Sequence, residues 1–368
     1  MGKAFKILLS LLLLTPLCAG AQNSTIAQRA KERMAAIRSS HNEKVERLKA
    51  EHEAFRKEVM AKWGEKEMVE STQKVWVEYS DDKESRFSVD FEKGEAVVEV
   101  LSGREEPKEV VAEKLQKAVG NLLGSRGKTI DFKSEVVEQK PVADKPILEN
   151  QIKITPKEVA SKSSSYAKKE VSTNAGVKSV NSVKLQLAAD HLSQRAEKVR
   201  PYVEKYSRMF GIDEPLVFAI IEQESAFNRM ARSGKNAYGL MQLVPNYGGK
   251  DAYYYVYKVN DEPDPEFLYN EDNNIRLGTA YIKILMTRDF SSIKERINNM
   301  LCTIAAYNTG AGNVARAFTG GLNVKGASGQ INSMSNAQLY NYLKQNLHHP
   351  EARGYIKGVT EKMKKYVK

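Results

Sequence analysis

The spacing of apolar residues changes along this chain, and these changes constrain its fold more than any other feature. In residues 23–64 apolar residues recur at steps of three and four, which predicts one long helix. In residues 72–101 they alternate, which predicts a three-stranded meander. From residue 190 onward every strong pattern is helical, with short breaks rich in Gly and Asn. Strands in one stretch and helices in another predict an α+β protein.

These patterns also predict the domain boundaries. Pro107 and Gly124 are expected to bound a helix with one apolar face, which completes a small domain after the meander. Residues 133–178 have few large apolar side chains and resemble a linker, and an alternating run at 183–187 favours a strand that returns to the sheet. We expect a signal peptide at 1–21, a long helix at 22–68, a small α+β domain at 69–132, a linker with a returning strand at 133–189 and an all-helical domain at 190–368.

The first residues, MGKAFKILLSLLLLTPLCAGAQ, have the organisation of a secretory signal. Two lysines precede an apolar run that is short for a membrane span, and a small-residue cleavage site follows at 19–21. Cleavage after Ala21 predicts an exported protein of the periplasm or cell envelope. The alternative is lipid attachment at Cys18, which would add association with the outer membrane. Leu17 disfavours that alternative, because the peptidase involved takes a small residue at this position.

The charge balance narrows the class of partner. The chain has 368 residues, a formal net charge of +11, a pI near 9.3, 41% hydrophobic residues and a mean hydropathy of −0.50, which excludes a membrane bundle. A basic surface favours nucleic acid, anionic lipid or an acidic wall polymer. Export argues against nucleic acid. Cys18 leaves with the signal or carries lipid, so the other cysteine, Cys302, has no disulfide partner and is expected to be a small buried hydrophobe.

Residues 222–242, EQESAFNRMARSGKNAYGLMQ, form the pattern most informative about function. They follow a predicted apolar helix that we expect Asp213 to cap. Glu224 lies four residues after Ile220 and continues the apolar stripe, whereas Glu222 points roughly 200° away and is predicted to be solvated. A carboxyl among apolar side chains has a raised pKa and can act as a general acid near neutral pH. The alternative is a buried structural Glu that bonds a loop backbone.

The acid has no obvious carboxylate partner in the segments expected around it. Most glycosidases use two carboxylates roughly 5–10 Å apart. No Asp or Glu occurs between Phe227 and Lys250, or between Ile297 and Pro350. If both segments line one cleft, that cleft holds a single acid. The substrate would then supply the second reacting group, for example its N-acetyl group or its own hydroxyl.

A third segment at 305–313, AAYNTGAGN, joins two predicted apolar helices. Its glycines mimic a dinucleotide-binding fingerprint, but no strand-like alternation precedes them and no acidic residue lies about 20 positions on. We therefore expect a tight turn that presents Tyr307 and Asn308, with a buried core tyrosine as the alternative for Tyr307. The tyrosine-rich stretch at 253–257 has two interpretations, a sugar-stacking surface or an aromatic helix face in the core.

Four ordered motifs together resemble the lytic murein transglycosylases of the goose-lysozyme-like superfamily. They are Glu224-Ser225-Ala226-Phe227, Ser233, the run GLMQLVP at 239–245, and Ala306-Tyr307-Asn308-Thr309-Gly310. The strand region at 74–101 is similar to the amino-terminal domain of the membrane-bound lytic murein transglycosylase C family. The resemblance implies a lysozyme-like, all-helical catalytic domain with a sugar-binding groove, preceded by a long helix and a small α+β domain.

The resemblance also implies a reaction and a set of site residues. Glu224 would protonate the oxygen between N-acetylmuramic acid and N-acetylglucosamine in peptidoglycan glycan strands, then accept the proton of the 6-hydroxyl as a 1,6-anhydro ring closes. Further site residues follow from the motifs: Ser233 and Gln242 to contact sugar, Tyr307 to orient Glu224 or the N-acetyl group, Met241 and Asn308 at wall positions, and Tyr355 to reach the acid. No cofactor is implied, and the five histidines lack metal-ligand spacing.

Two other functions fit the same sequence. A goose-type lysozyme would hydrolyse the same bond on the same fold, and a wall-binding protein would hold peptidoglycan without cleaving it. The helix at 23–64 likewise has two interpretations, a surface helix docked on its own protein or a helix for self-association.

Overall fold

The computed structural model describes residues 46–47, 49–130, 139–161, 166–174 and 176–367. The chain divides into two compact units, Met1–Met60 and Ala61–Lys368. In the first unit, residues 49–60 are helical, as the heptad-like spacing predicts. The signal peptide and most of the predicted self-association stripe lie outside the described residues. No described helix is both long enough and apolar enough to span a bilayer.

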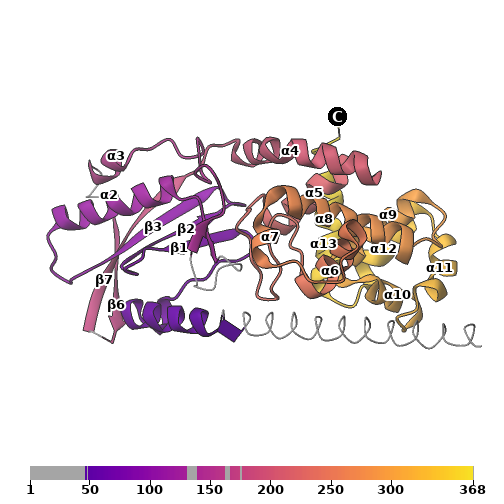
Figure 1. The fold of residues 1–368 in the computed structure, drawn as a ribbon, viewed down its shortest axis with the longest axis horizontal. Coiled ribbons are helices and arrows are strands. Elements are labelled where there is room, and N and C mark those ends of the chain that lie inside the picture. Colours follow the sequence, from indigo (N-terminus) through magenta and orange to yellow (C-terminus); the bar gives the residue numbers. More distant parts are fainter. Residues whose placement is uncertain (1–45, 48, 131–138, 162–165, 175, 368) are drawn as a thin grey trace, which may run out of the picture. The chain divides into compact units, whose positions relative to one another are not determined.

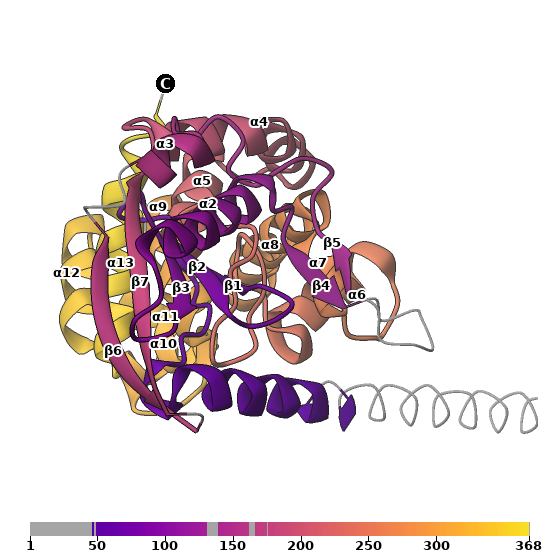
Figure 2. The ribbon, with the colours of Figure 1, turned by 90° about the vertical axis from the view of Figure 1, so that its left-hand side faces the viewer.

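The second unit begins with an antiparallel sheet and a long helix (Figure 1). The predicted meander is confirmed as β1 (Val75–Tyr79), β2 (Ser85–Asp90) and β3 (Glu95–Ser102). Two later strands, β6 (Ala167–Thr173) and β7 (Gly176–Gln186), complete the order β1-β2-β3-β7-β6. The helix α2 (Lys108–Gly124) packs on β2, β3 and β7, and Figure 2 shows it beside these strands.

The predicted apolar face of α2 forms the core of this α+β domain. Its inward residues are fully or nearly buried, and they are Val111, Leu115, Val119 and Leu122. They meet alternating inward side chains of the strands, among them Phe87, Val89 and Val98. Alternation of period two in the strands and a stripe of period 3.6 in the helix therefore close one hydrophobic core.

The predicted linker at 133–189 is wrong for most of its described part. The strand β5 (Gln139–Pro141) pairs with β4 (Lys128–Ile130), and α3 (Pro156–Ser161) packs on α2. The strand expected at 183–187 is the end of β7, which pairs with the whole of β3. Composition fails here because β6 is an exposed edge strand, so its two lysines and its serine need no apolar partners.

The rest of the second unit is helical, as predicted from residue 190 onward. It contains α4 (His191–Phe210), α5 (Glu214–Ser225), η3 (Pro245–Gly249), α6 (Lys250–Tyr257), α7 (Pro265–Tyr269), α8 (Glu271–Ile284), η4 (Leu285–Asp289), α9 (Arg296–Thr309), α10 (Ala311–Thr319), α11 (Val324–Asn332), α12 (Asn336–Asn346) and α13 (Pro350–Met363). The glycine-rich segment after α9 is the expected tight turn, in which Gly310 has φ of 83°. Cys302 is buried, as expected.

The helix α5 lies at the centre of this helical domain. It packs against α4 and α13, and its residues from Leu216 to Ile221 are all buried. A helix that is apolar around most of its circumference is stable only in such a core. Asp213 precedes the helix but makes no capping hydrogen bond. Its carboxylate instead accepts hydrogen bonds from Arg296 at 2.6 and 2.8 Å, so the predicted cap is wrong.

Candidate active site

Glu224 lies in the last turn of α5 and faces inward, as the apolar stripe predicts. Its side chain is 8% exposed. The Tyr355 hydroxyl, from α13, donates a 2.7 Å hydrogen bond to Glu224 Oε1. Tyr355 is itself buried, so this bond is shielded from water. The two helices that pack at the centre of the domain therefore hold a carboxyl and a phenol in contact.

The environment of Glu224 raises its pKa. Burial raises the pKa of this carboxyl to about 7, and the charge of Glu351 adds to the rise. The hydrogen bond from Tyr355 and the charge of Lys74 act in the opposite direction. Desolvation is the dominant cause, because water no longer stabilises the ionised form. A carboxyl with this pKa is present in both protonation states near neutral pH.

Tyr307, from the end of α9, stands beside the acid without bonding it. Its hydroxyl donates to the Met241 carbonyl oxygen at 2.9 Å. Burial raises the pKa of Tyr307 well above its usual value, and the nearby Glu224 charge raises it further. The ring also packs against Tyr281, with centroids 5.5 Å apart. Tyr307 therefore fixes the backbone of the turn at 239–242 next to Glu224.

The turn at 239–242 requires a glycine at its first position and a left-handed backbone conformation at its first and last positions. Gly239 has φ of 75°, and a Cβ there would lie 2.3 Å from the Leu268 carbonyl oxygen. Gln242 also has a positive φ, 47°, and its Nε2 donates to the Gly239 carbonyl at 3.0 Å. The Gln242 Oε1 is buried, and no donor among the described residues reaches it. An unsatisfied buried oxygen is unfavourable unless a ligand pairs with it.

Asn274, on α8, is the residue of this region that the sequence did not indicate. Its Oδ1 accepts from the Met241 backbone N–H at 2.8 Å, and its Nδ2 donates to the carbonyls of Tyr238 and Leu268. Asn274 is completely buried. Its place between Asn273 and Ile275 in an ordinary helical stretch gave no signal, because its partners lie in another part of the chain.

The other predicted substrate residues lie in two different environments. Ser233 is half-buried, and its Oγ accepts from the backbone N–H groups of Lys235 and Ala237, which closes the loop before the 239–242 turn. Met241 is fully buried, and its side chain lies against Gly278. Met241 therefore contributes its backbone to the turn, and its side chain belongs to the core.

A second carboxylate, that of Glu351, lies near enough to Glu224 for its charge to raise the pKa of that carboxyl. Asn308 Nδ2 donates to Glu351 Oε1 at 3.3 Å, and Lys235 Nζ lies 3.8 Å from Glu351 Oε2. Glu351 is exposed and lies one helical turn before Tyr355, so it shares a face of α13 with that residue. The acid-free segment after Ile297 ends at Pro350, and Glu351 is the next residue, so the prediction of a single acid in this region does not extend to α13.

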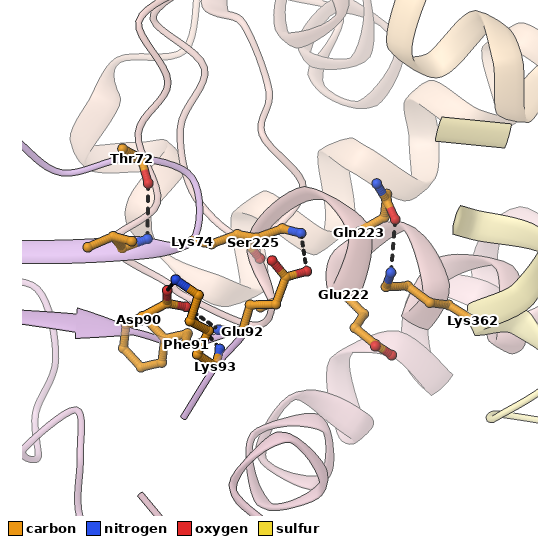
Figure 3. A network of polar contacts seen from close by, with 12 residues as sticks. Thr72, Lys74, Asp90, Phe91, Glu92, Lys93, Glu222, Gln223, Ser225 and Lys362 are labelled. Atoms are coloured by element: carbon orange, nitrogen blue, oxygen red, sulfur yellow. Dashed lines mark hydrogen bonds and ion pairs between the residues drawn. The ribbon is translucent and has the colours of Figure 1, made fainter. Parts of the chain in front are cut away.

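Glu222 is not solvated, so the sequence prediction for this residue is wrong. It is 5% exposed and accepts hydrogen bonds from Lys365 Nζ and the Tyr366 hydroxyl, both at 2.6 Å. Its neighbour Gln223 accepts from Lys362 at 3.0 Å, as Figure 3 shows. The helical wheel gave the right direction for Glu222, but the C-terminal part of the chain covers that side of α5.

The α+β domain also reaches this region. Figure 3 shows Lys74 and Glu92, which form an ion pair, beside the C-terminal end of α5. Next to Lys74, the Thr72 carbonyl accepts from the Arg232 backbone N–H at 3.4 Å, and the Gln73 carbonyl accepts from Asn228. Both Asn228 and Arg232 lie in the loop that follows Glu224.

The tyrosines of α6 lie in two environments, some packed inward and some exposed. Tyr253 and Tyr257 are half-buried and pack on Phe267 against the core. Tyr254 is 54% exposed. It lines a shallow cavity of about 280 Å³ together with Lys250, Asp251 and Asn260. The described residues contain no cluster of three or more His, Cys, Asp or Glu that could hold a metal ion.

Comparison with known proteins identifies the family. The family described as "Membrane-bound lytic murein transglycosylase C, N-terminal domain" matches residues 41–198, and "Transglycosylase SLT domain" matches residues 201–325. Membrane-bound lytic murein transglycosylase C of Haemophilus ducreyi is 30% identical and covers 83% of both chains. The protein of that name from Edwardsiella ictaluri is 32% identical over 83% of this chain and 85% of its own.

A third relative matches almost the full length. Membrane-bound lytic murein transglycosylase C of Glaesserella parasuis is 29% identical over 98% of each chain. The α+β fold with a lysozyme-like helical domain, expected from the sequence, is confirmed. The chain belongs to the membrane-bound lytic murein transglycosylase C family and is a lytic murein transglycosylase.

Proposed function

We propose that Glu224 is the catalytic acid and then the base of a lytic transglycosylase that cleaves the bond between N-acetylmuramic acid and N-acetylglucosamine in peptidoglycan. The observation that carries this proposal is a buried carboxyl with a pKa of about 7, bonded to Tyr355, in the motif expected to hold the acid. A general acid acts best when its pKa lies near the working pH.

The reaction needs only one such group. Glu224 gives its proton to the bridging oxygen as the bond from that oxygen to the muramyl C1 breaks. The muramyl N-acetyl oxygen stabilises the positive charge that develops at C1. The Glu224 carboxylate then takes the proton of the 6-hydroxyl while O6 bonds C1. The carboxyl ends protonated, and no water is consumed.

The surrounding polar groups support a role in sugar binding. The unpaired, buried Oε1 of Gln242 can accept a hydrogen bond from a sugar hydroxyl or an N-acetyl N–H. The Ser233 hydroxyl accepts two backbone bonds and keeps its own proton to donate. The half-buried Asn308 lies on the Glu351 side of the acid. We propose these three side chains as sugar contacts.

Hydrolysis is the second candidate, and Glu351 favours it. A carboxylate close to the acid could deprotonate a water that attacks C1, as the second carboxylate of many glycosidases does. Glu351 is exposed, and its carboxylate interacts with Lys235 and Asn308. Solvent therefore screens its charge, and its side chain is held only loosely. These features favour transglycosylation as the main reaction.

Mass spectrometry of digested sacculi separates the candidates. We expect the Glu224→Gln variant to fold normally and to lose about 1,000-fold or more of its activity, the order that proton transfer and activation of the 6-hydroxyl supply. The wild-type products should be lighter by one water than hydrolysis products. Full digestion by Glu224→Gln would refute the catalytic assignment. Hydrolytic products that disappear in Glu351→Gln would establish the lysozyme-type reaction.

We further propose that the protein works in the cell envelope, where its substrate lies. The relatives named above are described as membrane-bound. The amino-terminal sequence supports export, with lipid attachment at Cys18 as the route to an outer membrane. Labelling with a radioactive fatty acid, compared between the wild type and Cys18→Ala, tests that route.

A further inference from the structure

The loop that follows Glu224 is built into the core of the α+β domain. Ala226 caps α5 in the left-handed conformation, with φ of 49°, and Phe227 after it has φ of 60°. Ala226 is 2% exposed and belongs to the hydrophobic cluster of the α+β domain. Two successive non-glycine residues in the left-handed backbone conformation are strained, and surrounding structure must hold them there. That structure comes from the other domain.

Further along the same loop, Met230 enters the same core. A Cβ on Gly127 would lie 2.7 Å from Met230 Sδ and 2.9 Å from Ile147 Cδ1, so the loop and the α+β domain are in close contact there. Arg229 Nη2 also donates to the Val142 carbonyl at 3.1 Å. With the bonds from Asn228 and Arg232 already described, the whole loop at 226–232 is fixed by residues of the α+β domain.

Arg195, on α4, joins the two domains at this point. Its Nη2 donates to the Phe91 carbonyl at 2.8 Å and to the Ala226 carbonyl at 3.3 Å. Its Nη1 donates to Gln151 Oε1 at 2.6 Å, and His191 Nδ1 accepts at 3.0 Å from Nη2. The guanidinium also lies over the Phe91 ring, 4.7 Å from its centroid. Phe91, Gln151 and Ala226 lie in three different segments of the chain. Ala226 is the C-cap residue of α5, the helix that carries Glu224.

This cation is buried without a carboxylate. Arg195 is 5% exposed, and none of the ion pairs found among the described residues includes it. Burial lowers the pKa of Arg195 to about 9. Arg86, in the same unit, is equally buried but pairs with Glu99 at 2.6 Å. An unpaired buried charge is strongly unfavourable, so Arg195 needs a reason other than stability.

We propose that Arg195 is a positioning residue for the catalytic carboxyl, and that through it the α+β domain holds the loop at 226–232 so that Glu224 stays in its buried site. The inference rests on the proposed function of Glu224. Ala226 lies two residues after Glu224, so a shift of its carbonyl rotates the last turn of α5. The Glu224 side chain then leaves the Tyr355 hydroxyl and meets water.

Arg195→Lys tests the proposal with the charge kept. A lysine ammonium cannot reach Phe91, Gln151 and Ala226 together as the planar guanidinium does. We expect kcat on sacculi to fall about 100-fold with KM changed less than about twofold, since a small misplacement of the reacting group has this effect. Arg86→Lys is the matched control, because it weakens an equally buried arginine that has its own carboxylate. It should lower Tm and leave kcat within about twofold.

A second readout does not depend on activity. A carboxyl with a raised pKa makes the folded state less stable as pH rises, relative to the same protein with Gln at that position. The Tm difference between Arg195→Lys and Arg195→Lys/Glu224→Gln, followed from pH 4 to 8, therefore reports the pKa of Glu224. Among the described residues, the charged and phenolic groups that face Glu224 are Tyr355 and Glu351 on α13, Tyr307 on α9 and Lys74 just before β1, and neither variant alters them.

The expected result is a smaller Tm difference than in the wild-type pair, by about half or more, because Glu224 moves toward the ordinary pKa of about 4.3. An unchanged Tm difference together with unchanged kcat would overturn the proposal. If Glu224→Gln remains active, the proposed catalytic role of Glu224 is refuted. The Tm comparison then still tests whether Arg195 holds Glu224 in its buried site.

A variant inside the α+β domain covers the case in which Arg195→Lys does not fold. Gly127→Ala places a methyl group against Met230 and should displace the loop from a site that touches no substrate. Gly320→Ala is its control, because both glycines have φ of 69° and a Cβ on Gly320 meets nothing within 4 Å. We expect Gly127→Ala to lower kcat at least about tenfold more than Gly320→Ala. Equal effects of the two variants would contradict the proposal.

Discussion

At the scale of single residues, the pKa of one carboxyl, Glu224, depends on how little water reaches it. Glu224 and Glu222 are both buried, yet burial raises the pKa of Glu224, whereas Glu222 has two donors at 2.6 Å. Among the residues that the structure describes, Glu224 has one donor, the Tyr355 hydroxyl. Donors to the ionised form offset the loss of hydration, and the two carboxyl groups differ in how many donors they have.

This difference predicts that Glu224 lowers stability at neutral pH. The pKa of Glu224 is raised in the folded state to about 7, so the folded protein binds the proton more tightly than the unfolded chain does. Stability is therefore lost as pH rises from about 4.3 to 7, by about 3 kcal/mol. Glu224→Gln should match the wild type in Tm at pH 4 and exceed it at pH 8. A constant difference across this range would show that the pKa is not raised.

At the scale of elements, the site is a set of helix ends brought together by buried polar side chains. Glu224 ends α5, Tyr307 is near the end of α9, and Glu351 and Tyr355 lie in the first turns of α13. Between them lies the 239–242 turn, which has no regular structure of its own. Asn274 replaces that missing structure, because its amide pairs with three backbone groups.

We expect Asn274→Ala to lower the free energy of unfolding by about 2–4 kcal/mol, since it leaves buried backbone groups without partners. Activity should fall together with stability, because the turn carries Gln242. The neighbouring Asn273→Ala is the control, as Asn273 takes part in the capping bond only through its backbone N–H. Urea unfolding followed by circular dichroism measures both. A loss below about 1 kcal/mol for Asn274→Ala would contradict this account of the turn.

At the scale of the whole molecule, net charge is the property that bears on substrate. The formal net charge of +11 suits a polymer that carries carboxylates on its peptides. The basic groups are spread over the chain, and the charges among the described residues that shift the pKa of Glu224 are those of Glu351 and Lys74. Charge should therefore act on binding and leave the chemical step unaffected.

We predict that KM for sacculi rises with salt while kcat stays constant. Raising the ionic strength from 0.1 to 1 M shortens the screening length from about 10 to about 3 Å, which removes most long-range attraction. Binding of a neutral N-acetylglucosamine oligomer, measured by calorimetry, should not change over the same range. A salt-dependent kcat, or an equal effect on the neutral oligomer, would show that charge acts within the site.

The sequence by itself determined what depends on neighbours along the chain. Alternation predicted β1 to β3, a stripe predicted the buried face of α2, and four residues of helical spacing predicted that Glu224 faces inward. In each case one face of an element must be buried whatever covers it. The glycine-rich break after α9 was predictable for the same reason, because a positive φ is a local property of the backbone.

The tertiary structure decided everything that depends on what covers a face. Glu222 points where the helix period directs it, but the sequence does not show that Lys365 and Tyr366 lie there. Asp213 bonds Arg296 instead of its own helix, and Arg195 joins segments that are far apart in the chain. Glu222 and Arg195 have these partners because buried polar groups must pair wherever the fold brings them, whereas Asp213 and Arg296 form an exposed ion pair. Local spacing along the chain carries no record of either choice.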